Sequence, residues 1–141
     1  MSSFNFLLKN KRIFMIEDSP NNFAIAKMLL EQQGATVWFD RYGDSTFSRL
    51  QEFAPVDLIL LDLMFPNNVT GYDLFDQIRL LPNHLNTPIV AVSASDPSVA
   101  IPKTRSYGFQ GFIPKPLNFE FFARQIAQVV NDQQEIWITS S

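Results

Sequence analysis

The stretch Asp57-Leu58-Ile59-Leu60-Leu61-Asp62-Leu63-Met64 decides the fold. Its apolar centre is too short for a buried helix of ordinary length, and a loop rich in proline and asparagine follows it. The stretch therefore predicts a strand that is covered on both faces, as in a parallel sheet. Asp62 comes at the carboxyl end of this strand, where open α/β sheets bind ligands, so it is a candidate site residue. The alternative is an aspartate that caps the following turn.

Apolar strand-like segments alternate with segments of helical periodicity along the rest of the chain. The expected strands are residues 12–16, 35–39, 57–62, 88–92 and 112–113. The expected helices begin at Ser19 or Asn21, near Gly43, at Gly71, near Pro97 and at Phe119. Such alternation predicts a parallel sheet with helices on both faces and right-handed crossovers.

The segment between residues 95 and 106 is the least regular, because it holds Pro97 and Pro102. Two prolines at this spacing cannot both lie in one undistorted helix. Pro97 suits a first turn, whereas Pro102 is expected to start a short helix or to break a longer one.

The composition is that of one ordinary globular domain. Of the 141 residues, 46% are hydrophobic and 18% are charged, which argues against disorder. The formal charge of −3 and the lack of a Lys/Arg cluster argue against direct binding of nucleic acid. The chain has no cysteine, which fits a reducing compartment. Residues 1–11 lack the order of a signal peptide, and no apolar run reaches bilayer length, so we expect a cytoplasmic protein without a membrane partner.

Charged and hydroxyl side chains occur where strands give way to loops: Glu17, Asp18, Asp62, Ser93 and Lys115. They should converge, because the carboxyl ends of parallel strands meet at one edge. Three converging carboxylates favour a hard cation such as Mg²⁺. The lysine supplies a point charge and the serine a hydroxyl donor for a phosphoryl oxygen. Together these groups suit phosphoryl transfer onto an aspartate.

In this order, each at the end of its own strand, these residues resemble those of the CheY-type response-regulator receiver domains. The resemblance rests on Glu17-Asp18, Asp62, Ser93-Ala94 and Lys115-Pro116. It implies an α/β, flavodoxin-like (βα)5 fold, with a doubly wound parallel five-stranded sheet in the order 2-1-3-4-5. The receiver domain would comprise residues 11–131, between an N-terminal extension (1–10) and a C-terminal tail (132–141).

The resemblance also implies the role of each site residue. Asp62 would be the phospho-acceptor, Lys115 would pair first with Asp62 and then with the phosphoryl group, and Ser93 would turn toward a phosphoryl oxygen. Mg²⁺, with Mn²⁺ as an alternative, would be held by Glu17, Asp18, Asp62 and the backbone carbonyl of Met64.

Further residues are expected to tune the switch. Phe112 occupies the aromatic switch position, which moves from exposed to buried together with Ser93, although a plain core aromatic is the alternative. Met64 and Ser95 would adjust the lifetime of the phosphorylated state. The resemblance also implies a cis bond between Lys115 and Pro116, which the base rate for proline alone does not predict.

The implied partners are proteins. A sensor histidine kinase or a phosphotransfer protein would supply the phosphoryl group, and a downstream protein would bind the face formed by the fourth helix, fifth strand and fifth helix. Gln110-Gly111 lacks the acidic pair of DNA-binding, dimerising receivers, so a monomer or a weak dimer is expected. The chain would be a regulatory phospho-acceptor that assists its own phosphorylation and dephosphorylation, and not otherwise an enzyme.

Three other interpretations fit parts of the sequence. An aspartate-nucleophile phosphohydrolase needs a second acid two residues after the nucleophile, where this sequence has Met64. A receiver-like binding module that takes no phosphate would be expected to lack an acid, the lysine or the hydroxyl, and none is lacking. A receiver fragment of a larger regulator or hybrid kinase would have the same sequence features.

Two residues lie outside these motifs. Trp137 is expected to pack back onto the domain, the alternatives being a partner site or the start of a linker. His84 is expected to be a solvated loop residue.

Overall fold

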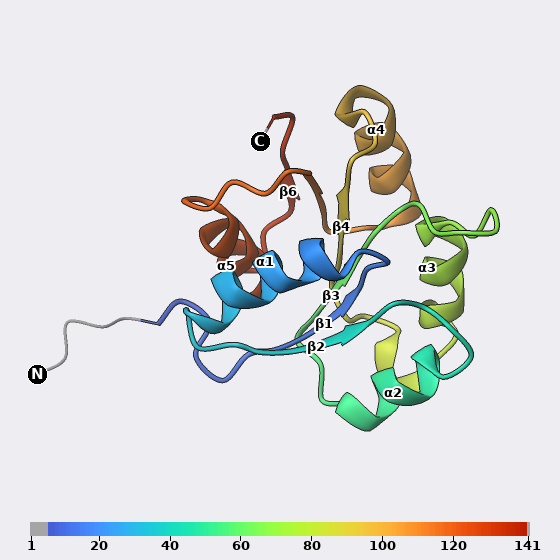
Figure 1. The fold of residues 1–141 in the computed structure, drawn as a ribbon, viewed down its shortest axis with the longest axis horizontal. Coiled ribbons are helices and arrows are strands. Elements are labelled where there is room, and N and C mark those ends of the chain that lie inside the picture. The colour runs from blue at the N-terminus through green and yellow to red at the C-terminus, as the bar shows by residue number, and fades with distance from the viewer. Residues whose placement is uncertain (1–5, 141) are drawn as a thin grey trace, which may run out of the picture.

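A parallel sheet lies at the centre of the computed structural model, which describes residues 6–140 (Figure 1). Its strand order is β2-β1-β3-β4-β5-β6. The strands are β1 (Arg12–Ile16), β2 (Thr36–Asp40), β3 (Leu58–Leu61), β4 (Ile89–Ser93), β5 (Gly111–Pro114) and β6 (Ile136–Trp137). The predicted α/β, doubly wound fold and the order 2-1-3-4-5 are therefore confirmed. The predicted number of strands is wrong by one, because the C-terminal tail adds β6 beside β5.

Helices cover both faces of the sheet, as Figure 1 shows. They are α1 (Pro20–Glu31), α2 (Thr46–Phe53), α3 (Gly71–Arg79), α4 (Pro97–Tyr107) and α5 (Phe122–Asp132), with a short 3₁₀ helix, η1 (Pro82–His84). Buried side chains of α1 and α5 form one core with one face of the sheet, and those of α2, α3 and α4 form a second core with the other face.

The central strand β3 contributes to both cores. Leu58 and Leu60 belong to the core under α1 and α5, whereas Ile59 and Leu61 belong to the core under α2, α3 and α4. Successive side chains of a strand point to opposite faces, so a continuous apolar run fits only a strand covered on both sides. This burial is what the opening stretch of the sequence predicted.

Side-chain caps begin the two helices that follow the acidic loops of the site. Ser19 caps α1 by accepting a hydrogen bond from the backbone N–H of Asn22, and Pro20 is its first residue. Thr70 and Asp73 form a capping box at the start of α3. Such caps satisfy backbone N–H groups that have no partner within the helix.

Helix α4 runs without interruption through Pro102, so the prediction that this proline starts or breaks a helix is wrong. Asp96 caps the helix by accepting a hydrogen bond from Ser98 N at 3.0 Å. Ala100 and Thr104, on either side of Pro102, are buried against the sheet. This packing holds the helix together despite the backbone hydrogen bond that proline cannot donate.

Two other details differ from expectation. Helix α5 begins at Phe122 rather than at Phe119. The Asn118 side chain accepts hydrogen bonds from the backbone N–H groups of Glu120 and Phe121, so the residues just before the helix form a turn. His84 is only 1% exposed, so the prediction of a solvated loop residue is wrong. His84 ends η1, and its Nδ1 lies 3.0 Å from the Thr87 hydroxyl.

Segments near both ends of residues 6–140 pack onto the sheet and helices. Residues 1–5 of the predicted N-terminal extension lie outside the described residues, but Leu8 is fully buried beside α1 and α5. In the tail, Ile136 is buried and Trp137 is half-buried, so Trp137 packs back as expected. Within residues 6–140, no helix is both long and apolar enough to cross a bilayer.

Candidate functional site

The acidic residues of the site come from two neighbouring strands. Glu17 and Asp18 directly follow β1, and Asp62 directly follows β3, with Ile16 and Leu61 paired in the parallel register. The backbone N–H of Asp62 donates to the Ile16 carbonyl at 3.1 Å. Glu17 and Asp62 are therefore neighbours across the carboxyl edge of the sheet.

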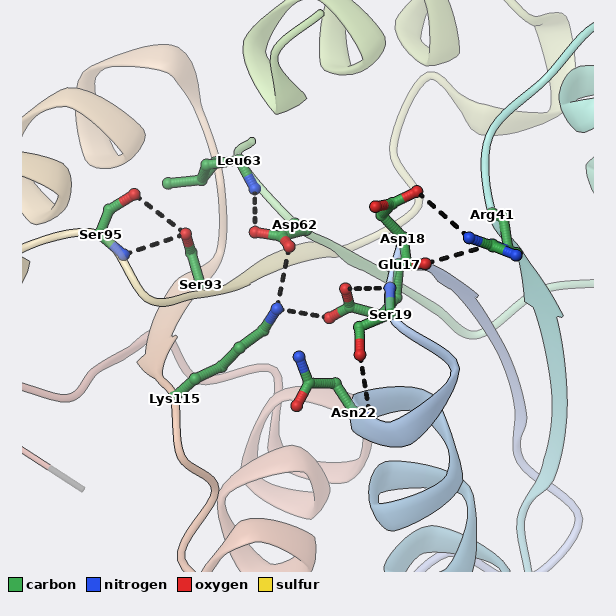
Figure 2. Close-up of polar contacts among 10 residues, drawn as sticks. All are labelled: Glu17, Asp18, Ser19, Asn22, Arg41, Asp62, Leu63, Ser93, Ser95 and Lys115. Carbon is green, nitrogen blue, oxygen red and sulfur yellow. Dashed lines mark hydrogen bonds and ion pairs between the residues drawn. The ribbon is translucent and has the colours of Figure 1, made fainter. Parts of the chain in front are cut away.

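Lys115 joins these two carboxylates, as Figure 2 shows. It follows β5, and its Nζ lies 2.5 Å from Glu17 Oε1 and 2.9 Å from Asp62 Oδ2. The side chains of Lys115, Glu17 and Asp62 are 12%, 2% and 10% exposed. Water therefore screens the attraction between the lysine and the two carboxylates only weakly. The other oxygen of Asp62 accepts a hydrogen bond from Leu63 N at 2.7 Å, which fixes the orientation of the carboxylate.

Burial and charge act in opposite directions on this cluster. Burial raises the pKa of Glu17, and the hydrogen bonds from Lys115 and from Ser19 N–H offset only part of that rise. For Lys115, burial by itself lowers the pKa, but the hydrogen bonds and charges of Glu17 and Asp62 outweigh it, so the pKa is raised. Lys115 is thus held in its charged form beside Asp62.

Asp18 faces away from Lys115 and toward the end of β2. Its Oδ1 lies 3.9 Å from Arg41 Nη2, and its backbone carbonyl accepts a hydrogen bond from Arg41 Nε at 3.2 Å. Across residues 6–140, no three acidic or histidine side chains are gathered closely enough to form a ready metal site. The donors at this edge are nevertheless the carboxylate and carbonyl oxygens that Mg²⁺ prefers, so the residues suit the ion in kind.

The hydroxyl groups lie on the other side of Asp62. Ser93 ends β4 and is buried, and its Oγ lies 3.0 Å from Ser95 Oγ and accepts a hydrogen bond from Ser95 N. A cavity of about 320 Å³ opens here, lined by Asp62, Met64, Ser93, Ala94, Ser95 and Lys115. The structure therefore brings the predicted acceptor, lysine and serine to one cavity, with the exposed side chain of Met64 beside it.

Phe112 is fully buried in the core against which Trp137 packs, so in this structure it does not occupy the exposed position from which the expected switch would start. The cis bond between Lys115 and Pro116 is present, as the resemblance implied. A second cis bond, between Ala54 and Pro55, was not predicted.

Two residues next to the site belong to none of the predicted motifs. Arg41 lies in a loop and belongs to no motif, and only the fold brings it to Asp18. Gly71 starts α3, and a Cβ atom at this position would collide with the backbone carbonyl of Asp62. Its place at the start of a predicted helix, nine residues after the candidate acceptor, was the available signal.

Two curated proteins match most of this chain in sequence. The chain is 28% identical over 122 residues to the sensory transduction protein BceR of Halalkalibacterium halodurans, covering 84% of this chain and 49% of that protein. It is 32% identical over 119 residues to BceR of Bacillus subtilis, covering 82% and 48%. The chain thus spans about half the length of these curated relatives.

A solved structure shows the same fold. The chemotaxis protein CheY4 of Vibrio cholerae superimposes with a TM-score of 0.76 and 21% sequence identity, covering 85% of this chain and 98% of that one. At this identity the likeness concerns the fold alone.

The family comparison covers most of the chain. Residues 13–127 match the family described as the response regulator receiver domain. Phosphorylation by a sensor kinase is the general function of this family. This chain therefore belongs to the response regulator receiver domain family.

Proposed function

We propose that Asp62 is the phospho-acceptor of a switch that controls binding to a downstream protein. The observation that carries this proposal is the position of Asp62: its carboxylate pairs with Lys115 at 2.9 Å and lines a cavity together with the Ser93 side chain. A sensor histidine kinase or a phosphotransfer protein supplies the phosphoryl group. The chain acts in the cytoplasm as a regulatory protein and has no separate substrate.

The chemistry is a displacement at phosphorus. An oxygen of Asp62 attacks the phosphorus atom, the bond from phosphorus to the donor nitrogen breaks, and its electron pair leaves with the donor. Lys115 stays protonated and neutralises negative charge, first on the carboxylate and then on the phosphoryl oxygens. Ser93 then donates its hydroxyl hydrogen to a phosphoryl oxygen after leaving Ser95.

Receiver domains generally bind Mg²⁺, and here Glu17, Asp18, Asp62 and the Met64 carbonyl would hold it, with Mn²⁺ as an alternative. The ion supplies positive charge next to the transferred group. Asp18 would take part beside Arg41, whose Nη2 lies 3.9 Å from Asp18 Oδ1.

The remaining predicted residues modulate the switch. Met64 and Ser95 line the cavity and set the access of water to the phosphoryl group. Phe112 transmits the change at Ser93 to the face formed by α4, β5 and α5, which binds the downstream protein. The unit that does this is the receiver domain of residues 11–131, as a monomer or a weak dimer.

Intact-mass spectrometry tests the proposal. After incubation with Mg²⁺ and a small phosphodonor, the wild type is expected to gain one phosphoryl group, and the gain is expected to disappear in Asp62→Asn and on chelation of the metal. Asp76→Asn, which changes an exposed aspartate of α3, serves as the matched control and keeps the gain. A folded protein that binds Mg²⁺ but gains no mass would contradict the switch and favour a binding module that does not depend on phosphorylation.

A further inference from the structure

The C-terminal segment occupies the edge of β5, which belongs to the predicted partner face. Strand β6 is parallel to β5, with Gly111 opposite Ile136 and Phe112 opposite Trp137. Ile136 N donates to Gln110 O, and Ile138 N donates to Phe112 O, each at 3.0 Å. This segment, labelled β6 in Figure 1, is the last strand in the order of the sheet, next to β5.

Gly111 makes room for this strand. A Cβ atom built at Gly111 would lie 2.5 Å from Ile136 O and 2.6 Å from Ile136 Cγ1. Cβ atoms essentially never approach backbone this closely, so any other residue would push the segment away from the edge. The edge of β5 is thus shaped to receive a closely approaching extended backbone.

The two faces of β6 meet two different surfaces. Ile136 packs into the core beside α5, whereas Trp137 packs against the core that contains Phe112 and presents its ring to α4. The guanidinium carbon of Arg105, on α4, lies 4.6 Å from the centre of the Trp137 ring. An aliphatic residue followed by an aromatic one is the pair that these two surfaces accept, because neighbouring residues of a strand point to opposite faces.

The attachment of β6 is short. The strand has two residues, Trp137 is only half-buried, and Arg105 is exposed. Residues 133–135, which connect the strand to α5, are exposed. The strand also lies outside residues 13–127, which match the family. Elements with few buried contacts open at low free-energy cost.

We propose that the edge of β5 and the adjoining side of α4 form a docking site for an extended peptide segment with an aliphatic residue followed by an aromatic one. The chain's own residues 135–138 are the resident occupant, which a partner protein displaces by adding its own strand. This inference refines the partner face of the proposed function. Its test uses unphosphorylated protein, so its failure leaves the chemistry of Asp62 untouched.

A peptide in trans tests the docking site. The probe is a fluorescently labelled peptide with the sequence of residues 133–140, titrated against full-length protein in an anisotropy assay. In the tail variant, Ile136→Ser with Trp137→Ser, the resident strand no longer competes, and the peptide is expected to bind roughly tenfold or more tightly than to the wild type. Adding Gly111→Ala is expected to remove this gain. Adding Gly43→Ala instead is the matched control and preserves it, because a Cβ there meets no atom within 4 Å.

Two results would overturn the proposal: equal binding of the peptide to the wild type and to a folded tail variant, or unchanged binding when Gly111→Ala is added. A wild-type dimer by light scattering, lost in the tail variant, would also overturn it and make a second copy the occupant. If the tail variant does not fold, hydrogen exchange of the Ile136 and Ile138 amides decides the question. Exchange is expected to be faster in Gly111→Ala than in the wild type and in Gly43→Ala, and equal rates would contradict a detachable strand.

Discussion

Lys115 balances the charge of the site at the scale of single residues. It is the common partner of two carboxylates that are both almost fully buried. Removal of a shared cation leaves buried charge without compensation, which costs far more than the loss of a pair on the surface.

We expect Lys115→Met to lower the free energy of unfolding by about 2–4 kcal/mol, measured by urea denaturation. Adding Glu17→Gln should recover part of this loss, because one of the two uncompensated carboxylates is then gone. Lys27→Met is the matched control: Lys27 pairs with Glu31 at 2.6 Å on the surface, and its loss should cost less than about 1 kcal/mol. Equal losses in the two lysine variants would show that the Lys115 contacts do not stabilise the fold.

His84 gives a prediction about pH. Burial lowers the pKa of this imidazole from 6.5, and the charge of Arg79 adds to the shift. Below about pH 6.5 the unfolded chain takes up a proton on His84 more readily than the folded chain, so stability falls as the pH falls. The slope from this single group is at most about 1.4 kcal/mol per pH unit.

His84→Gln should therefore lose less stability than the wild type between about pH 7 and pH 5, measured by urea denaturation at a series of pH values. The comparison of the two proteins cancels the titration of Glu17 and the other acids. Parallel pH profiles would mean that His84 is protonated equally readily in the folded and unfolded chains.

At the scale of elements, a proline inside α4 lowers the stability of this helix. Pro102 lies in the helix interior and is exposed, so it lacks the backbone N–H without contributing to the core. Pro102→Ala should raise the free energy of unfolding by about 1–3 kcal/mol, measured by chemical denaturation.

Pro97→Ala is the control for this prediction, because Pro97 is in the first turn, where no backbone hydrogen bond is missing. It should change stability by less than about 1 kcal/mol. A loss of stability in Pro102→Ala would indicate that the proline ring makes a contact that the helix needs.

At the scale of the whole molecule, the sheet separates two cores, and segments near both ends of the described residues reach one of them. Leu8 and Ile136 belong to the core under α1 and α5, and the Asn131 side chain donates to the Leu7 carbonyl at 2.7 Å. Leu8→Ala should therefore cost about 2–5 kcal/mol of unfolding free energy.

Leu7→Ala is the neighbouring control, because Leu7 is 37% exposed and should cost less than about 1 kcal/mol. Calorimetry or urea denaturation of both variants decides whether the folded unit begins before residue 11. Equally small effects would support the predicted boundary at residue 11.

The sequence by itself determined the features that depend on local pattern. The continuous apolar run of β3 required burial on both faces, and the order of Glu17, Asp62, Ser93 and Lys115 at strand ends placed them at one edge. Both inferences follow from the period of a strand and from the common direction of parallel strands.

The tertiary structure alone decided the features that depend on residues far apart in the chain. Strand β6 exists because β5 offers an open edge and Gly111 leaves room for it. Helix α4 continues through Pro102 because the sheet buries its neighbours, and Asp18 turns to Arg41 because β1 and β2 end side by side. In each case the deciding free energy comes from packing or charge across the fold, which local propensity does not contain.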